Sequence, residues 1–490
     1  MTRSTPRRRL LTSLAIAAGV LALLGARLAR PVLHTDEVTY VSKVLDSLVQ
    51  GRALPVDGAG AVFANKPPLS LWLMRGAFVV LGPGPFAARL PSIVAAAATA
   101  VAIYLFAAFF LEEAAGVVAA LLFVLAAGPL GEHSLRRATP DALEILLMTV
   151  AIGCLEAWRR RRLPQALAGL LVAVAALAWV KSPFALAVLL FYLLVTELPA
   201  RRAGVGTPRL ALTAGLLVGV WSAAYLLWLA VLAANFSWDA VGRRLLLQQY
   251  ARRLQGHIGN LEGPGYYATT IAADFGPLLV LPVVAAFVAW RRPLADPQRE
   301  RHDALCLFAW AIAAPLLATL SASKLPWYPY LSYPGLALLL GVAAWRIAAA
   351  VSPRPWVRTA LLALVVATAV WRLPVRDIWP REPQYRTLAG RLWEVSRSLP
   401  EARFVTPGKL RRGRGGDNSR ESRFYVGAIL WQQSRRPRQQ GPCVVDLLDV
   451  PPASAPPASV VVILREARAG PPLFAVDRCD GRVRDRLKTR

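Results

Sequence analysis

Three lysines in this 490-residue chain precede prolines in similar short motifs. Lys66, Lys181 and Lys324 each stand one or two residues before a proline, whereas nearly every other basic residue is arginine. An ammonium group is a compact point charge with three rotatable donors, and a nearby proline restricts the backbone that positions it. Such a turn suits a phosphate oxygen, so we expect the three lysines to bind a phosphate group. The alternative interpretation is that each lysine extends from a helix end toward lipid headgroups.

Acidic residues occupy comparable positions. Asp36 and Glu37 follow the first apolar segment, and Asp141 begins another apolar segment directly after Thr139-Pro140. A carboxylate close to an acceptor hydroxyl acts as a general base, which is the chemistry that group transfer requires. The same acids are equally suited to capping the helices that they open, because negative charge stabilises a helix N-terminus. The sequence alone leaves both interpretations open.

The histidines form no recognisable metal-binding motif. His34, His133 and His257 all fall in predicted outer loops, but their spacing matches no known ligand pattern. Asp274 and Glu144 are interpreted as packing or helix-capping groups. We therefore predict no metal site, and a requirement for a divalent metal stays open.

Apolar segments of about 20 residues, the length that crosses a bilayer core, dominate residues 10–374. They predict an all-α polytopic membrane domain, residues 1–374, with about eleven transmembrane helices. The predicted spans are 10–29, 88–111, 114–131, 141–158, 163–180, 183–199, 209–233, 267–290, 304–322, 326–349 and 356–374. The amphipathic or shorter segments 38–49, 69–81 and 243–254 are expected to be interfacial helices, the first two in an outer loop over 30–87.

The chain carries 57 Lys plus Arg against 29 Asp plus Glu, a formal net charge of +28. Most arginines stand at the ends of apolar segments, which indicates topology signals and contact with anionic lipids rather than nucleic-acid binding. If the eleven spans alternate in direction, arginines from five places lie on the same side of the membrane. These places are 7–9, 159–162, 201–202, 291–292 and 346 with 354 and 358. That side is predicted to be cytoplasmic, with the N-terminus. The lysines and acids described above then share the outer face.

Residues 375–490 have the composition of a soluble domain, which an odd number of spans places outside the cytoplasm. Helical stretches at 384–398 and 422–431 alternate with strand-like runs at 403–406, 459–464 and 473–476, which predicts a small α/β domain. Cys443 and Cys479 both fall in it. Whether they form a disulfide stays open.

The ordered set of motifs resembles the GT-C superfamily of glycosyltransferases, in particular the bacterial aminoarabinose transferases and protein mannosyltransferase-like membrane enzymes. The motifs that carry the resemblance are Asp36-Glu37, Asn65-Lys66-Pro67-Pro68-Leu69, Thr139-Pro140-Asp141 and Ser323-Lys324-Leu325-Pro326-Trp327-Tyr328. They extend over roughly residues 30–350. Asn65 departs from the pattern, because relatives often have an acid there, and this counts against a metal ligand at that position.

The resemblance implies a polyprenyl-phosphate sugar as the donor, and it assigns roles to individual residues. Asp36, with Glu37, would engage the acceptor nucleophile, and Asp141 would be the second catalytic carboxylate. The residues expected to bind the donor phosphate are Lys66, Lys181, Lys324, Arg137 and Tyr328. The hypothesis requires the acids and the lysines to line one cavity beside the lipid.

These observations predict a multi-pass glycosyltransferase of the bacterial inner membrane, with its C-terminal domain in the periplasm or outside the cell. It would move a sugar from the polyprenyl-phosphate donor to a lipid, glycan or protein acceptor, with inversion at the anomeric carbon. A transporter or flippase for an anionic lipid or lipid-linked sugar is the alternative. Transporters tend to have inverted repeats and polar residues at the midplane. This sequence has mostly boundary polar residues and no visible repeat, which favours the enzyme.

Overall fold

A computed structural model describes most of the membrane portion and parts of the C-terminal region. The described residues are 5–26, 28, 35–56, 63, 66–130, 135–181, 183–202, 207–235, 237, 262–291, 297–373, 393, 403–405, 424–425, 428–429, 444–448, 460–464 and 473–477. The chain divides into two compact units. Unit 1 contains Met1–Ala26, Ala64–Ser70 and Ser92–Trp379, and unit 2 contains Arg27–Phe63, Leu71–Pro91 and Pro380–Arg490. The boundary near residue 374 remains a prediction.

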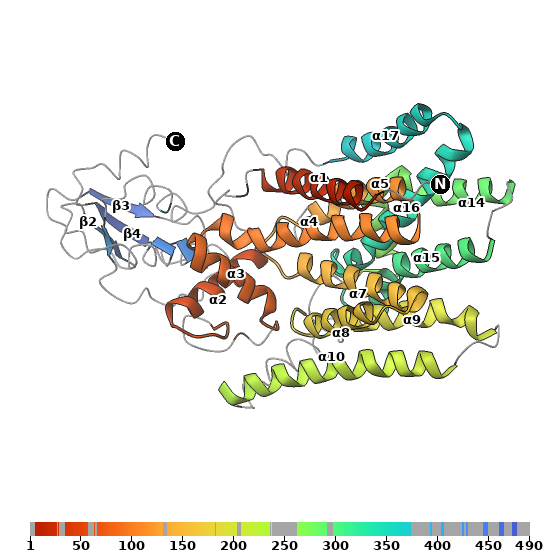
Figure 1. Ribbon diagram of the computed structural model, residues 1–490. Helices are drawn as coiled ribbons and strands as arrows, with labels where there is room; N and C mark the ends of the chain where they lie inside the picture. The colour runs from red at the N-terminus through yellow and green to blue at the C-terminus, as the bar shows by residue number, and fades with distance from the viewer. Residues whose placement is uncertain are drawn as a thin grey trace. The chain divides into compact units, whose positions relative to one another are not determined.

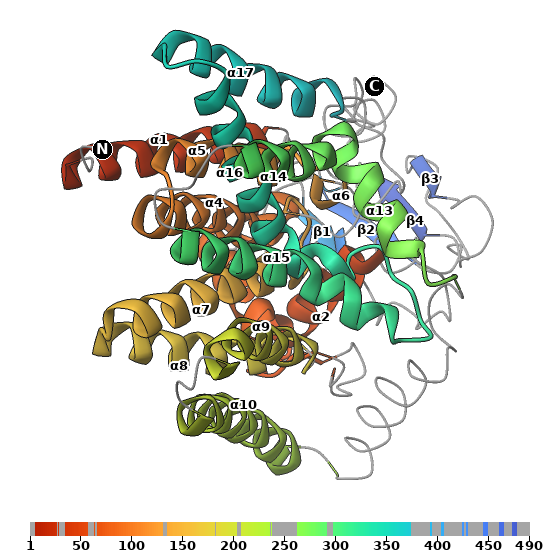
Figure 2. The same cartoon turned by 90° about the vertical axis from the view of Figure 1, so that its right-hand side faces the viewer.

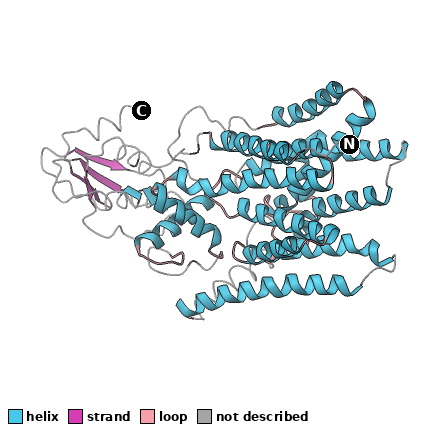
Figure 3. Ribbon diagram, viewed as in Figure 1, coloured by secondary structure: helices cyan, strands magenta, loops and turns pink. Residues whose placement is uncertain are grey.

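Helices make up the described part of unit 1 (Figure 3). Those before residue 203 are α1 (Pro6–Gly25), α4 (Pro85–Phe110) from Ser92 onward, α5 (Glu113–Val124), α6 (Ala127–Leu130), α7 (Asp141–Arg161), α8 (Pro164–Ala178) and α9 (Phe184–Arg202). The later ones are α10 (Thr207–Asn235), α13 (Tyr266–Phe275), η2 (Gly276–Val280), α14 (Leu281–Arg291), α15 (Pro297–Thr319), η3 (Tyr328–Ser332), α16 (Tyr333–Val351) and α17 (Pro355–Trp371). Figures 1 and 2 show α7, α8 and α9 running alongside one another.

Every predicted span overlaps one of these helices, so the all-α membrane architecture is confirmed. By length and composition, six helical segments of the described chain could each cross a membrane. They are Pro6–Gly25, Pro85–Phe110, Leu210–Asn235, Tyr266–Ala289, Gln298–Thr319 and Tyr328–Val351. Shorter apolar helices cover other predicted spans, so the number of eleven crossings stays a prediction. Segment 243–254 lies outside the described residues.

Small residues allow the helices of unit 1 to approach closely. Helix α16 packs against α5, and a Cβ on Gly341 would lie 2.5 Å from the carbonyl oxygen of Ala115. Trp310 of α15 is fully buried, and its indole nitrogen donates to Leu331 O at 3.1 Å. This packing fixes the short helix η3 against α15, and η3 follows the Lys324 motif directly.

Helix α7 extends from one end of unit 1 to the other. It begins with Asp141 and ends with Arg159–Arg161, an arrangement that suits the helix dipole at both termini. At 1.5 Å per residue, its 21 residues extend about 30 Å, close to the thickness of a bilayer core. Acids and arginines therefore lie at opposite ends of the same helix.

Arginines from three of the five predicted places, 7–9, 159–162 and 346, lie at one end of unit 1. Arg9 of α1 lies over the ring of Phe109, with 5.1 Å between its guanidinium carbon and the ring centroid, and Arg161 lies over the same ring at 5.5 Å. At this end Arg346 also pairs with Glu300 of α15 at 2.9 Å. Which side of the membrane this end faces stays a prediction.

Unit 2 contains α2 (Thr35–Val49), most of α3 (Leu69–Leu81) and a four-stranded sheet. The strands β1 (Arg403–Val405), β2 (Val444–Leu448), β3 (Val460–Leu464) and β4 (Leu473–Asp477) are ordered β1-β2-β4-β3. Strands β1 and β2 are parallel, and the other pairs are antiparallel. Three strands match predicted runs, and β2 was not predicted. The predicted helices 384–398 and 422–431 lie largely outside the described residues, as do Cys443 and Cys479.

Candidate active site

Asp141 and Lys181 form a buried ion pair at the acidic end of α7. Asp141 opens α7, and Lys181 lies in the turn between α8 and α9. The ammonium nitrogen of Lys181 is 2.7 Å from Asp141 Oδ1 and 2.9 Å from Glu144 Oε2. The helical spacing of three residues places both carboxylates on one face of α7, where a single ammonium contacts both. Each of these three residues is buried.

Lys66 adds a second cation to this cluster. Its charge acts on Glu144 together with that of Lys181, and Lys66 itself is buried. The backbone connects the two lysine turns directly, because Leu69 N donates to Trp179 O at 3.0 Å. We call Lys66, Asp141, Glu144 and Lys181 the lysine–acid cluster. With every group ionised, its two negative and two positive charges balance.

Lys181 stays protonated in this environment. Burial disfavours its ammonium form, but the adjacent carboxylates of Asp141 and Glu144 outweigh burial and raise its pKa above the ordinary lysine value. Lys181 therefore keeps its positive charge at neutral pH, which a role in binding a phosphate group requires.

Lys324 is bound differently from the other two lysines. Its ammonium donates to the carbonyl of Thr319 at 2.7 Å and to that of Ser321, beyond the end of α15. It also lies 6.0 Å from the ring centroid of Tyr267, whose hydroxyl accepts from Leu325 N at 3.2 Å. These contacts neutralise the negative end of the α15 dipole. Binding of a donor phosphate by Lys324 stays a prediction.

Tyr328 connects this motif to the turn that contains Lys181. The ring centroids of Tyr328 and Phe184 are 5.7 Å apart, and Phe184 is the first residue of α9. The Lys324 motif and the turn that contains Lys181 are therefore neighbours in space at the acidic end of unit 1.

The Arg136-Arg137 motif lies in the same unit. Arg136 donates to the carbonyls of Leu24 at 3.1 Å and Ala26 at 2.6 Å, so it caps the C-terminal end of α1. Arg137 is partly exposed and makes contacts of its own. Its assignment to the donor phosphate stays a prediction.

Glu37 and Arg89 form a buried two-point ion pair within unit 2. Arg89 Nε donates to Glu37 Oε1 at 2.8 Å and Nη2 to Oε2 at 3.0 Å. A third donor, Nη1, reaches Leu28 O at 3.0 Å. Since both carboxylate oxygens of Glu37 accept from one guanidinium, this residue anchors the start of α2. The neighbouring Asp36 is partly exposed.

The structure thus brings Asp141, Lys181 and Lys66 together and gives Glu37 an anchoring contact. Asp36 belongs to unit 2, and its predicted meeting with the lysines stays a prediction. Asn65 lies outside the described residues. Glu144, interpreted from the sequence as a packing or helix-capping group, pairs with Lys181 in the first turn of α7; its spacing of three residues from Asp141 was a usable signal for this contact.

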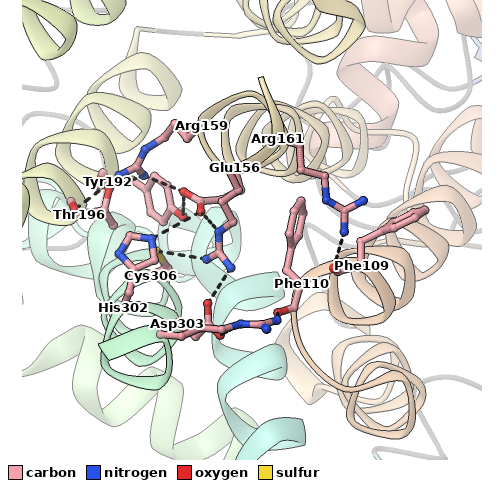
Figure 4. A network of polar contacts seen from close by, with 12 residues as sticks. Phe109, Phe110, Glu156, Arg159, Arg161, Tyr192, Thr196, His302, Asp303 and Cys306 are labelled. Carbon is pink, nitrogen blue, oxygen red and sulfur yellow. Dashed lines mark hydrogen bonds and ion pairs between the residues drawn. The ribbon is translucent and has the colours of Figure 1, made fainter. Parts of the chain in front are cut away.

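A second polar network lies at the arginine end of unit 1 (Figure 4). Glu156, His302 and Cys306 place ligand-type atoms within 4.8 Å of one another, a grouping that the sequence did not suggest. Glu156 Oε1 already accepts from Arg159 at 2.7 Å, and Oε2 accepts from Arg160 at 2.8 Å. Two guanidinium charges on this carboxylate oppose a further cation. His133 and His257 lie outside the described residues.

Comparison with known proteins supports the resemblance predicted from the motifs. Residues 65–238 match the family model described as dolichyl-phosphate-mannose-protein mannosyltransferase. This stretch includes Lys66, Asp141, Glu144 and Lys181. No curated protein sequence matches the chain.

Several solved structures share the fold. The crystal structure of ArnT from Cupriavidus metallidurans bound to undecaprenyl phosphate has a TM-score of 0.64 at 16% identity, with 97% of this chain and 98% of that one covered. Its apo form gives a TM-score of 0.61 at 17% identity, with 98% and 99% covered. The oligosaccharyltransferase AglB from Archaeoglobus fulgidus, in complex with an inhibitory peptide and a dolichol-phosphate, gives 0.53 at 13% identity, with 85% and 63% covered. None of these comparisons supports the transporter alternative.

Proposed function

We infer that the chain is a membrane glycosyltransferase that uses a lipid-phosphate-linked sugar donor. The chain has the GT-C fold, and residues 65–238 match the dolichyl-phosphate-mannose-protein mannosyltransferase model. The observation that carries the chemistry is the lysine–acid cluster. It holds two buried ammonium groups beside the first turn of α7, a helix of 21 residues that extends about 30 Å. A donor with its phosphate at the membrane boundary and its isoprenoid chain in the lipid suits that arrangement.

The proposed reaction is displacement at the anomeric carbon of the donor sugar. The bond between that carbon and the phosphate oxygen breaks, and negative charge develops on the departing polyprenyl phosphate. Lys66 and Lys181 stabilise this charge, and one such fixed donor contributes about 3 kcal/mol to the transition state. The ammonium of Lys181 has three N–H donors, and Asp141 and Glu144 use two of them. We assign the third to an oxygen of the donor phosphate. We assign Lys324, Arg137 and Tyr328 to the surroundings of the same phosphate by the resemblance.

Asp36 is the proposed general base that engages the acceptor hydroxyl or amine, again by the resemblance. Its neighbour Glu37 holds the first turn of α2 in place through Arg89, so the two acids have separate tasks. Attack from the face opposite the phosphate gives inversion at the anomeric carbon.

The proposed location is the bacterial inner membrane, with the N-terminus and the arginine end of unit 1 in the cytoplasm. The lysine–acid cluster then faces the periplasm or the cell exterior, together with the C-terminal region. Lipids, glycans and proteins are all candidate acceptors.

Release of polyprenyl phosphate by purified protein tests this proposal. With a polyprenyl-phosphate sugar and a panel of acceptors, we expect release that requires an acceptor. Lys66→Ala should lower the rate by about 100-fold. The control Lys43→Ala should keep the wild-type rate, because Lys43 lies over the ring of Phe63 and is not part of the lysine–acid cluster. Equal rates in both variants would refute the role of Lys66, and release in neither variant nor wild type with any acceptor would refute the transferase.

A further inference from the structure

The Lys324 motif and the first turn of α13 meet at a tyrosine. Leu325 N donates to the hydroxyl of Tyr267 at 3.2 Å, and the ammonium of Lys324 lies 6.0 Å from the centroid of the Tyr267 ring. Tyr267 is 2% exposed and Lys324 is 4% exposed. A charged group and a phenol hydroxyl are therefore buried side by side, as far from water as the two lysines of the lysine–acid cluster.

Tyr267 and Lys324 each have a hydrogen-bond donor without an acceptor among the described residues. The ammonium of Lys324 has three N–H donors, and the carbonyls of Thr319 and Ser321 accept two of them. The Tyr267 hydroxyl accepts from Leu325 N, but no side chain or carbonyl in the described ranges accepts its own proton. Buried donors that lack an acceptor are costly and rare in folded proteins. An acceptor from outside the chain would satisfy both.

The charge of Lys324 indicates that this acceptor is an anion. In the part of the chain that the structure describes, no carboxylate pairs with Lys324, whereas Lys181 pairs with both Asp141 and Glu144. A water molecule would satisfy the two donors but leave the ammonium charge without a partner. A phosphate oxygen accepts from an ammonium and from a hydroxyl at once, and hydrogen bonds to an ionised acceptor are the stronger ones.

The same contacts connect Tyr267 to the lysine–acid cluster within unit 1. The hydroxyl groups of Tyr267 and Tyr328 interact electrostatically, and the Tyr328 ring lies 5.7 Å from that of Phe184. Phe184 begins α9, three residues after Lys181. Tyr267 therefore belongs to the end of unit 1 to which the donor phosphate is assigned.

We propose that Tyr267 is a further ligand of the donor phosphate and that its O–H and the third N–H of Lys324 bind one phosphate oxygen. This inference rests on the proposed function, because it takes the phosphate to be that of the polyprenyl-phosphate donor. The two hydrogen bonds need only a phosphate oxygen, so they form with the donor and with the polyprenyl phosphate that departs from it.

Native mass spectrometry of the full chain in detergent tests this proposal, with a polyprenyl phosphate and the polyprenol of the same length as probes. Wild type should bind the phosphate more tightly than the alcohol. Tyr267→Phe removes only a hydroxyl, so its affinity for polyprenyl phosphate should fall about tenfold while its affinity for polyprenol is kept. The control Tyr266→Phe removes the hydroxyl of the adjacent residue of α13 and should bind both lipids as wild type does.

A second variant separates binding by Tyr267 from an effect on the position of Lys324. Lys324→Gln keeps N–H donors for the two carbonyls but loses the charge, so it should also bind polyprenyl phosphate less tightly. The double variant Tyr267→Phe/Lys324→Gln should bind it less tightly still. If the double variant binds like Lys324→Gln alone, Tyr267 only positions Lys324 and the proposed ligand is wrong. Lys324→Gln also tests the site if Tyr267→Phe does not fold.

Three other results overturn the proposal. They are equal binding of the two lipids by wild type, wild-type affinity for polyprenyl phosphate in Tyr267→Phe or in Lys324→Gln, and an equal loss of affinity for both lipids in Tyr267→Phe. Failure of the proposed function is seen separately, as wild type that releases no polyprenyl phosphate with any acceptor.

Discussion

Replacing Lys181 with methionine removes a buried ammonium group that contacts both Asp141 and Glu144. The remaining carboxylates are buried on adjacent turns of α7. Removing one partner of a buried ion pair costs about 3–5 kcal/mol, because the other charge is left without compensation. Here two carboxylates lose their nearest cation, so we expect Lys181→Met to lower the free energy of unfolding by an amount at the upper end of that range.

A triple variant separates this stability effect from the catalytic one. Asp141→Asn/Glu144→Gln/Lys181→Met has no charge at these three positions, and its side chains are close in size to the originals. It should recover most of the stability that Lys181→Met loses, since replacing a whole buried charge group is far less costly than breaking it. It should stay inactive, because both the cation that stabilises the departing phosphate and the carboxylate of Asp141 are absent.

Unfolding of both variants in detergent, followed by tryptophan fluorescence, measures the first effect, and release of polyprenyl phosphate measures the second. Two results refute the reasoning. If Lys181→Met unfolds at the wild-type midpoint, the buried ion pairs do not exist. If the triple variant transfers sugar at the wild-type rate, Lys181 does not bind the donor phosphate.

Three further predictions address other parts of the structure. Arg89→Met should destabilise α2 by about 3–5 kcal/mol, because it removes the guanidinium from which both carboxylate oxygens of the buried Glu37 accept. Hydrogen exchange of α2 amides should rise, and unchanged exchange refutes the anchor. Gly341→Val should lower the midpoint of thermal unfolding, because the added Cβ meets Ala115 O. The control Gly215→Val, in open space on α10, should lower that midpoint far less. Similar decreases in the two variants refute the close packing. Asp36→Asn should lower turnover by about 100-fold while donor binding is retained, and lost donor binding contradicts a role toward the acceptor alone.

Much of the helical fold follows from local patterns in the sequence. The predicted segment 69–81 coincides with α3, and the strand-like runs near 403, 460 and 473 coincide with β1, β3 and β4. Strand β2 was missed because Asp446 interrupts a run of only five residues. The strand order depends on pairings between residues far apart in the chain, which local patterns do not encode.

The sequence allowed the residues of the candidate site to be predicted, but not which of them contact one another. Thr139-Pro140-Asp141 and Lys181-Ser182-Pro183 were recognised as separate motifs, yet the 2.7 Å contact joins residues 40 positions apart. The same holds for Glu37 and Arg89, 52 positions apart. Three lysine–proline motifs looked alike in sequence, but Lys324 binds backbone carbonyls, because its turn begins at the exposed end of α15.

The position of the donor phosphate is the most direct test of the whole account. A cryo-electron microscopy structure of the protein with bound polyprenyl phosphate measures it. We predict that the phosphorus lies within hydrogen-bonding reach of the ammonium groups of Lys66 and Lys181, with the isoprenoid chain along the lipid-facing helices. A phosphate found elsewhere, with Lys181 still paired only to Asp141 and Glu144, would contradict the account.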